Sequence, residues 1–203
     1  MIIEIHAHTQ EHSPCSHIKA SDLVRSIFDK GIGGIVLTDH HFLWTDDELS
    51  NLRINADIPE DFLVLAGQEV FTKDFGDVLV YGADESISQS TGLTAIRRKY
   101  PDAALIWAHP YRSGLIPVMT ELFDSCFDAI EILNPRQKEW ENERGISDWK
   151  TWGFTATSGT DIHDDDFTEL YPIHLKEDVK DIKGFASCIK RGLCFPVMGK
   201  YMH

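Results

Sequence analysis

The feature that most constrains this chain is a repeated alternation of short apolar runs with segments of helical periodicity. The apolar runs are rich in β-branched and aromatic residues and end in polar residues, which is typical of buried strands. Strands are predicted at Ile2–His6, Gly34–Thr38, Phe62–Ala66, Val78–Gly82, Ala104–Ala108, Ala129–Leu133 and Phe154–Thr157, with Cys194–Met198 as an eighth candidate. Helices are predicted at Ser21–Phe28, Leu93–Lys99, Pro117–Phe123, Gln137–Trp152 and Val179–Lys190. This alternation predicts βα units and a largely parallel sheet.

The length of the chain limits how these units can be arranged. A full eight-stranded barrel usually needs about 250 residues, whereas this chain has 203 residues for about seven predicted units. We therefore expect an α/β fold in the form of a small, distorted barrel. Since no internal repeat, low-complexity tract or linker divides the sequence, residues 1–203 are expected to form a single domain.

Composition narrows the expected environment and partners. The formal net charge is −14 and the sequence pI is near 5.0. Phosphate backbones should be repelled, so duplex nucleic acid is not expected as a partner. The four cysteines, Cys15, Cys126, Cys188 and Cys194, form no C-x-x-C pair, which favours a reducing compartment. No stretch approaches the roughly 20 apolar residues of a membrane span. A cytoplasmic protein with no membrane partner is the expectation, and the oligomeric state is left open.

Potential metal ligands follow the predicted strands. His6 and His8 end the first strand, and residues i and i+2 of a strand point to the same face, so both imidazoles can bind one ion. Similar residues follow four later strands: His40 in Thr38-Asp39-His40-His41, Glu69, His109, and the pair Asp161 and His163. In a parallel barrel the carboxyl ends of the strands meet at one mouth. We therefore expect these side chains to form one cluster.

The types of ligand indicate which metals would bind. Imidazoles together with carboxylates suit Zn²⁺, Mn²⁺ or Fe²⁺ better than Ca²⁺ or Mg²⁺. The candidates are too many for one tetrahedral ion, so two or three divalent ions are expected. Glu69 is the preferred bridging ligand, because a carboxylate has two oxygens with which to contact two ions.

Taken together, these motifs resemble the PHP (polymerase and histidinol phosphatase) family, over essentially the whole chain and in the same order. The resemblance implies a distorted (β/α)₇ barrel, a trinuclear metal centre and phosphoesterase activity. It implies that His6, His8, Glu69 and Asp161 hold one metal. Glu69 and His109 would help to hold a second, and His40 and His163 would belong to a third.

Two stretches depart from the family pattern. After the H-x-H motif, where many members have another ligand, Glu11, His12, Cys15 and His17 compete, and Cys15 is preferred. Asp77 stands where many members have a further histidine, and it is a candidate ligand in its place.

The expected activity is release of phosphate from a small phosphomonoester or nucleotide by a metal-activated hydroxide. Glu69 and Asp161 are assigned to this catalytic centre, and His41 is either a proton donor to the leaving group or a neighbour of a ligand. Arg112 and Arg136 are candidates for binding the phosphate, since guanidinium groups bind it bidentately. Two alternatives remain: an amidohydrolase-like enzyme that cleaves C–N bonds, and a non-catalytic metal-binding domain. Residues 42–59 are the longest candidate for a lid.

Overall fold

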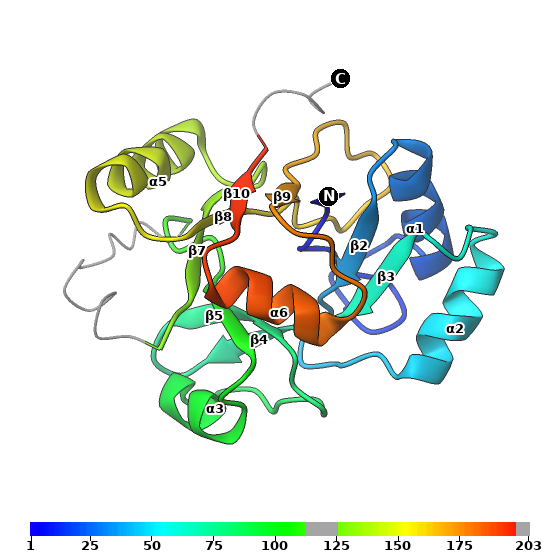
Figure 1. Cartoon of the computed structure of the whole chain (residues 1–203), viewed down its shortest axis with the longest axis horizontal. Helices are drawn as coiled ribbons and strands as arrows, with labels where there is room; N and C mark the ends of the chain where they lie inside the picture. The colour runs from blue at the N-terminus through cyan, green and yellow to red at the C-terminus, as the bar shows by residue number, and fades with distance from the viewer. Residues whose placement is uncertain (113–125, 198–203) are drawn as a thin grey trace.

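The computed structural model of the chain describes residues 1–112 and 126–197. The strands in this part are β1 (Ile2–Ile3), β2 (Gly34–Leu37), β3 (Leu63–Ala66), β4 (Gln68–Thr72), β5 (Gly76–Tyr81), β6 (Ala104–Trp107), β7 (Ala129–Leu133), β8 (Ala156–Ser158), β9 (Ile173–Leu175) and β10 (Cys194–Pro196). The helices are α1 (Ala20–Asp29), α2 (Asp46–Asn55), α3 (Leu93–Lys99), α5 (Glu139–Trp152) and α6 (Ile182–Lys190) (Figure 1).

The described strands form three separate sheets. Their strand orders are β1-β9-β10, β2-β3 and β4-β5-β6-β7-β8. Isolated parallel bridges link neighbouring sheets, pairing Glu4 with Ile35, His40 with Glu69, and Ala7 with Ile162. The strands thus surround a common interior, but no sheet in the described residues closes on itself. The α/β class is confirmed, whereas the expected (β/α)₇ barrel is not shown.

The largest sheet also departs from the expected parallel arrangement. β5 is antiparallel to both β4 and β6, while β6, β7 and β8 are mutually parallel. Only three residues separate Thr72 from Gly76, which suits a hairpin, whereas a parallel pair needs a crossover of about a dozen residues or more. Sequence reasoning missed β4 because it follows β3 after a single residue, Gly67, and the two were read as one strand and its end.

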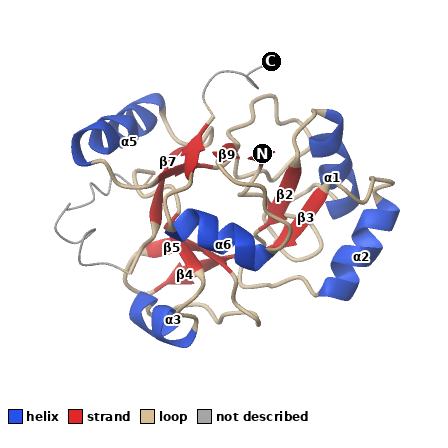
Figure 2. Cartoon of the chain, viewed as in Figure 1, coloured by secondary structure: helices blue, strands red, loops and turns tan. Residues whose placement is uncertain are grey.

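Apolar packing fills the interior and the spaces between strands and helices. α1 turns Leu23, Val24 and Ile27 inward, the three-to-four-residue spacing of an amphipathic helix. α6 lies across one end of the ring of strands (Figure 1). There the buried Phe185 ring packs edge-on against Tyr81, with ring centroids 5.0 Å apart. The other helices lie around the outside of the strands (Figure 2). Thus α6 covers one end of the ring, and the other described helices cover its sides.

The segment expected to be a lid contains α2 instead. Thr45 and Glu48 form a capping box at its N-terminus, and Leu52 is buried against the core that includes α1 and β3. The predicted helix Pro117–Phe123 and the last residue of the predicted strand Cys194–Met198 lie outside the described residues. In the described part of the chain, no helix has the length and apolar character that crossing a membrane requires.

Candidate metal centre

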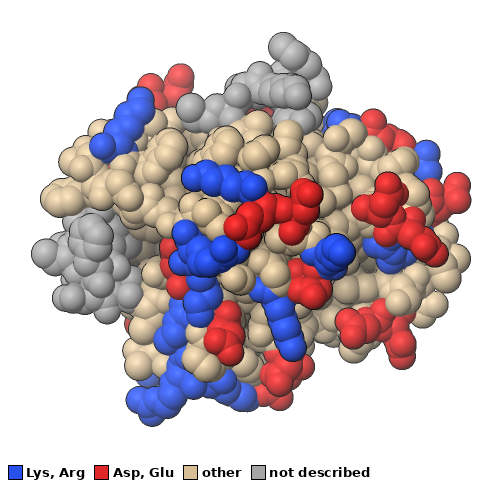
Figure 3. Space-filling view, in the orientation of Figure 1, with Lys and Arg blue, Asp and Glu red and all other residues tan. Residues whose placement is uncertain are grey.

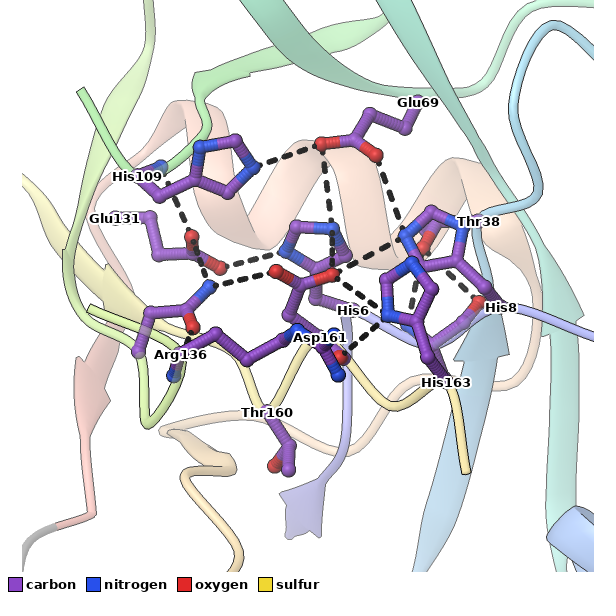
Figure 4. Close-up of polar contacts among 12 residues, drawn as sticks. His6, His8, Thr38, Glu69, His109, Glu131, Arg136, Thr160, Asp161 and His163 are labelled. Atoms are coloured by element: carbon purple, nitrogen blue, oxygen red, sulfur yellow. Dashed lines mark hydrogen bonds and ion pairs between the residues drawn. The ribbon is translucent and has the colours of Figure 1, made fainter. Parts of the chain in front are cut away.

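The predicted ligands come together at the end of the ring opposite α6. Three groups of side chains place their ligand atoms within 4.8 Å of one another: His8, His40 and His163; His6, His8 and Asp161; and His6, Glu69 and His109. His6 belongs to two of these groups and His8 to two, so the groups form one continuous cluster (Figure 4). Ligands from strand ends that are far apart in the sequence therefore lie together at one end of the ring, as we expected.

Glu69 lies in the middle of this cluster. Its Oε1 is 3.1 Å from His109 Nε2 and 3.4 Å from His6 Nε2. Its Oε2 is 3.2 Å from His8 Nε2 and 3.2 Å from His40 Nδ1. Each oxygen therefore faces a different pair of imidazoles, which is the arrangement that a bridging carboxylate needs.

Asp161 occupies the opposite side of the cluster. Its Oδ1 is 3.4 Å from both His8 Nε2 and His163 Nδ1, and 3.5 Å from His6 Nε2. The backbone at Asp161 and at His109 has positive φ, 57° and 31° respectively. Such conformations cost about 1–3 kcal/mol in residues other than glycine and persist where the surroundings enforce them. The surrounding fold thus holds the backbone of these two residues in a conformation that residues other than glycine rarely adopt.

Two buried nitrogens show that the cluster fits a metal. His6 Nε2 and His8 Nε2 are fully buried and have no hydrogen-bond partner in the described structure. Leaving a buried polar atom unpaired is costly, and both atoms face the carboxylate oxygens of Glu69 and Asp161. Imidazole nitrogens and carboxylate oxygens converging in this way are donors suited to Zn²⁺, Mn²⁺ or Fe²⁺.

Burial and mutual charge shift the pKa values of the central groups in opposite directions. Burial by itself would raise the pKa of Glu69, but the charge of His6 and the hydrogen bond from His109 outweigh it and hold that pKa well below its usual range. Burial would lower the pKa of His6, yet the carboxylates of Glu131, Asp161 and Glu69 raise it well above its usual value. Divalent ions would compete with protons for these lone pairs.

Glu131 is a central residue that sequence reasoning missed. This fully buried side chain on β7 places Oε1 2.9 Å from His6 Nδ1, and its Oε2 accepts a 2.9 Å hydrogen bond from the His109 backbone N–H. Asn134 Nδ2 also donates to Oε2 at 3.0 Å. A carboxylate on the far nitrogen of a metal-binding imidazole fixes its tautomer and orientation. The signal in the sequence is a glutamate within the apolar run Ala129–Leu133.

Two further buried carboxylates hold the segments that carry ligands. Glu4 accepts hydrogen bonds from the backbone N–H groups of His6 and Thr160, and burial raises the pKa of Glu4 to about 7. Asp39 Oδ1 accepts a 2.5 Å hydrogen bond from Ser13 Oγ, which lies 3.3 Å from His8 Nδ1. Asp39 therefore reaches the His8 imidazole through the Ser13 hydroxyl.

The residues proposed to replace missing family ligands lie outside the three ligand groups. The Cys15 side chain is exposed, and burial followed by the charges of Glu69 and Asp161 raises its pKa. Asp77 is half-buried, and burial followed by the charge of Glu69 raises its pKa. The charge of Glu69 therefore acts on both side chains, although neither belongs to a ligand group.

The competing candidates in the loop after His8 have other contacts. The Glu11 carboxylate accepts the backbone N–H of Ala20 at the start of α1. His12 stacks on Phe42 with ring centroids 3.4 Å apart, and His17 is exposed. These three side chains do not belong to the described ligand groups.

His41 points away from the cluster. Its Nδ1 lies 3.1 Å from the Ile87 carbonyl oxygen, and its Nε2 accepts a long hydrogen bond from the Phe71 backbone N–H at 3.5 Å. Both ring nitrogens thus contact backbone groups. These contacts favour the hypothesis that His41 is a neighbour of a ligand over the hypothesis that it donates a proton to the leaving group.

The two candidate phosphate-binding arginines lie at the edge of the cluster. The Arg112 guanidinium forms an ion pair with Asp161 Oδ2, and its side chain is one third exposed (33%). Its Nε is buried and has no hydrogen-bond partner among residues 1–112 and 126–197. Arg136 lies 3.8 Å from Asp164 Oδ2 and lines a hollow of about 270 Å³ together with Asp161, His163 and Phe167. Both cations therefore border the space in front of the ligands.

The chain matches no known family model, and no curated protein is similar enough in sequence to count as a match. Solved structures do share its fold. PsfC from Pseudomonas syringae has a TM-score of 0.69 at 12% identity, covering 98% of this chain and 91% of that one. A protein from Bifidobacterium adolescentis assigned as a metal-dependent phosphoesterase has a TM-score of 0.62 at 13% identity, covering 94% and 96%.

Two further neighbours widen the range of chemistry found on this fold. An amidohydrolase from Chromobacterium violaceum with bound sulfate has a TM-score of 0.60 at 12% identity, covering 88% of this chain and 92% of that chain. Endonuclease Q, in complex with a 27-mer duplex substrate carrying an abasic lesion, has a TM-score of 0.55 at 12% identity, covering 94% and 57%. Because Endonuclease Q and the assigned phosphoesterase are PHP-type proteins, the fold of this chain is PHP-like.

The complex of Endonuclease Q corrects one expectation. Net charge was used to exclude duplex nucleic acid as a partner, and that exclusion is wrong, because a protein with this fold binds a duplex at its active site. The physical reason is that a net charge of −14 averages over the whole surface. Contact with phosphates depends on the local field at a site, to which bound cations contribute strongly.

Proposed function

We propose that this protein is a metal-dependent hydrolase that releases phosphate from a small phosphomonoester or nucleotide. The observation that carries this proposal is the continuous ligand cluster, in which the two oxygens of Glu69 face different imidazole pairs. A cluster of this kind would hold two or three neighbouring ions from the group Zn²⁺, Mn²⁺ and Fe²⁺. Neighbouring divalent ions would activate water and neutralise the oxygens of a phosphoryl group.

The residues of the chain would then have distinct tasks in hydrolysis. Glu69 and Asp161 would hold the ions in place, and Glu131 would fix the orientation of the His6 ring. Arg112, whose buried Nε has no partner in the described part of the chain, would bind the phosphate oxygens while it remains paired with Asp161. Arg136 would contact the part of the substrate that extends beyond the ligand cluster. Water supplies the oxygen that ends on phosphorus, and the leaving oxygen takes up a proton.

Two other functions compete with this proposal. Cleavage of a C–N bond is supported by the fold shared with an amidohydrolase, but a carboxylate, Glu69, stands at the centre of this cluster where such enzymes usually have a carbamylated lysine. A non-catalytic metal-binding domain would keep the ligands for stability alone. The side chains that border the cluster, Arg112 and Arg136, favour a phosphorylated substrate over both.

A phosphate-release assay tests the proposal most directly. Purified protein supplied with Mn²⁺ or Zn²⁺ would be assayed on phosphomonoesters, nucleotides, phosphodiesters and a duplex with an abasic site, and on amide substrates in parallel. We expect phosphate release from a compact monoester, abolished by EDTA. The variant Glu69→Gln should lose at least about 100-fold in kcat, because removing one electrostatic contributor to a transition state typically costs that much.

The controls separate the alternatives. Glu141→Gln changes another buried glutamate, which caps α5 through the Lys138 backbone N–H at 2.8 Å and lies outside the cluster, so it should retain activity. Metal-dependent cleavage of amides without phosphate release would establish the amidohydrolase alternative. Bound metal with no turnover of any substrate would establish the non-catalytic one.

A further inference from the structure

A second hollow lies at the end of the molecule opposite the ligand cluster. It has a volume of about 700 Å³ and lies between the C-terminal end of α3 and one face of α6. Ala103, on its wall, precedes β6, whereas His109 follows β6 at the other end. The hollow and the metal centre are therefore separated by the length of the strands.

Small residues keep this hollow open. Gly82, Ala103 and Ala186 line it. Gly82 has a φ of +98°, a conformation that side chains rarely adopt, and a Cβ at this position would lie 3.6 Å from both Ala103 Cα and Ala186 Cβ. The concave shape thus follows from the sequence and does not depend on a flexible loop.

Cations outnumber carboxylates among the residues that line the hollow. Four cationic residues line it, Lys99, Lys183, Lys190 and Arg191, against two carboxylates, Asp84 and Asp102. The chain as a whole carries −14, so a local excess of positive charge stands out here. Figure 3 shows Lys and Arg side chains gathered over α6 and α3 on this face.

The four cationic side chains differ in the polar partners that they have. Lys99 pairs with Glu85, and Arg191 with Glu177. Lys190 Nζ donates to the carbonyl oxygen of Pro101 across the hollow. Lys183 has no hydrogen-bond or ion-pair partner among residues 1–112 and 126–197. Lys183 and Lys190 lie seven positions apart on α6, which is about two helical turns, so they present their charges from the same face.

We propose that this α3–α6 hollow is a second binding site, separate from the metal centre, for a small anion with two or more phosphate-type groups. Lys183 and Lys190 would contact the anion directly, and the floor of small residues would let it approach α6. A compact multivalent anion fits better than a single charge, because it can contact both lysines at once. The concave floor and the nearby Asp84 and Asp102 disfavour a long duplex, which could not enter.

Calorimetric titration with methylenediphosphonate, a diphosphate analogue that resists hydrolysis, tests this site. The full chain would be titrated in low salt, with and without EDTA. We expect one saturable site that persists in EDTA, in addition to any binding at metal ions. The double variant Lys183→Ala/Lys190→Ala should weaken the EDTA-resistant site at least about tenfold, while the phosphate-release activity of the protein stays unchanged.

A matched control distinguishes a site from general charge attraction. Lys73→Ala/Lys150→Ala removes the same charge from two exposed lysines elsewhere and should leave the titration unchanged. Equal losses in both double variants, or no EDTA-resistant binding to the wild type, would overturn the proposal. So would displacement of the probe by a DNA duplex with higher affinity. None of these results bears on the phosphoesterase proposal, which is tested by the Glu69→Gln assay.

Discussion

At the scale of single residues, Glu131 connects two ligands that come from different strands. Its two oxygens contact the His6 ring and the His109 backbone. Gly159 packs against it so closely that a Cβ would lie 2.5 Å from His6 Cβ and in direct overlap with the Glu131 carboxylate. This crowding leaves the carboxylate and the imidazole little freedom to rotate.

We predict that Glu131→Gln weakens metal binding about 10- to 100-fold, the usual effect of losing a partner of a metal-binding imidazole. A glutamine can still accept from His6, but its amide would meet the donors His109 N–H and Asn134 Nδ2. Competition with a fluorescent chelator measures the change in affinity. Glu141→Gln serves as the buried control, and an unchanged affinity in Glu131→Gln would assign Glu131 no positioning role.

The candidate ligands could be predicted from the sequence because of where they occur. H-x-H and D-x-H place two donors on one face of a strand, and polar residues directly after an apolar run mark a strand end. Glu131 and Glu4 could not be predicted in this way. Each lies inside an apolar run, where one charged residue usually indicates a face exposed to solvent, and only the folded structure brings His6, His109 and Thr160 to them.

At the scale of elements, a clear apolar face made two helices predictable, and one helix without such a face was missed. α1 and α6 have clear apolar faces and were predicted nearly to their ends. α2 has few apolar residues, and only its capping box, Thr45 to Glu48, marks it. The direction of β5 depends on the short turn after Thr72, which alternation of strands and helices does not reveal. The expectation of a largely parallel sheet did not anticipate the antiparallel β5.

The contact of α5 with β7 leads to a prediction about stability. Gly145 is buried on α5, and a Cβ there would lie 2.7 Å from the carbonyl oxygen of Ile132. Alanine favours a helix over glycine by about 1 kcal/mol, but overpacking a tight contact costs about 1–3 kcal/mol. The difference between these two effects predicts that Gly145→Ala destabilises the protein by up to about 2 kcal/mol, which urea unfolding measures.

Ser147→Ala provides the control on the same helix, because Ser147 is exposed. Only helix propensity should act there, so the free energy of unfolding should rise by a few tenths of a kcal/mol. A stabilising effect of Gly145→Ala, equal to that of Ser147→Ala, would mean that α5 is not pressed against β7 as described.

At the scale of the whole molecule, the ligand cluster joins segments that are far apart in the chain. His6, His40, His109 and Asp161 follow four different strands, and Glu69 lies in a fifth, β4. These strands belong to three sheets, which isolated bridges and backbone hydrogen bonds link to one another. Bound ions would therefore cross-link three sheets through segments that are far apart in the sequence. Stability should depend strongly on the metal.

We predict that saturating Mn²⁺ or Zn²⁺ raises the melting temperature. Ligand at 100 times its Kd stabilises a protein by about 2.7 kcal/mol, and for a chain of this size 1 kcal/mol corresponds to about 2–4 °C. An increase of about 5–10 °C in differential scanning calorimetry is expected, reversed by EDTA and largely absent in Glu69→Gln. An equal increase in that variant would place the stabilising ions elsewhere.

The single bridge between Ala7 and Ile162 has a consequence for the choice of metal. Three backbone hydrogen bonds accompany this bridge: the His8 N–H donates to the Ile162 carbonyl oxygen, and the Asp161 and Ile162 N–H groups donate to the His6 carbonyl oxygen. Because this junction is a short bridge and not an extended strand ladder, it can widen or narrow by small amounts without breaking a sheet. Ions of somewhat different radius can then be accommodated with little strain, so the metal present in the cell would depend on supply more than on fit.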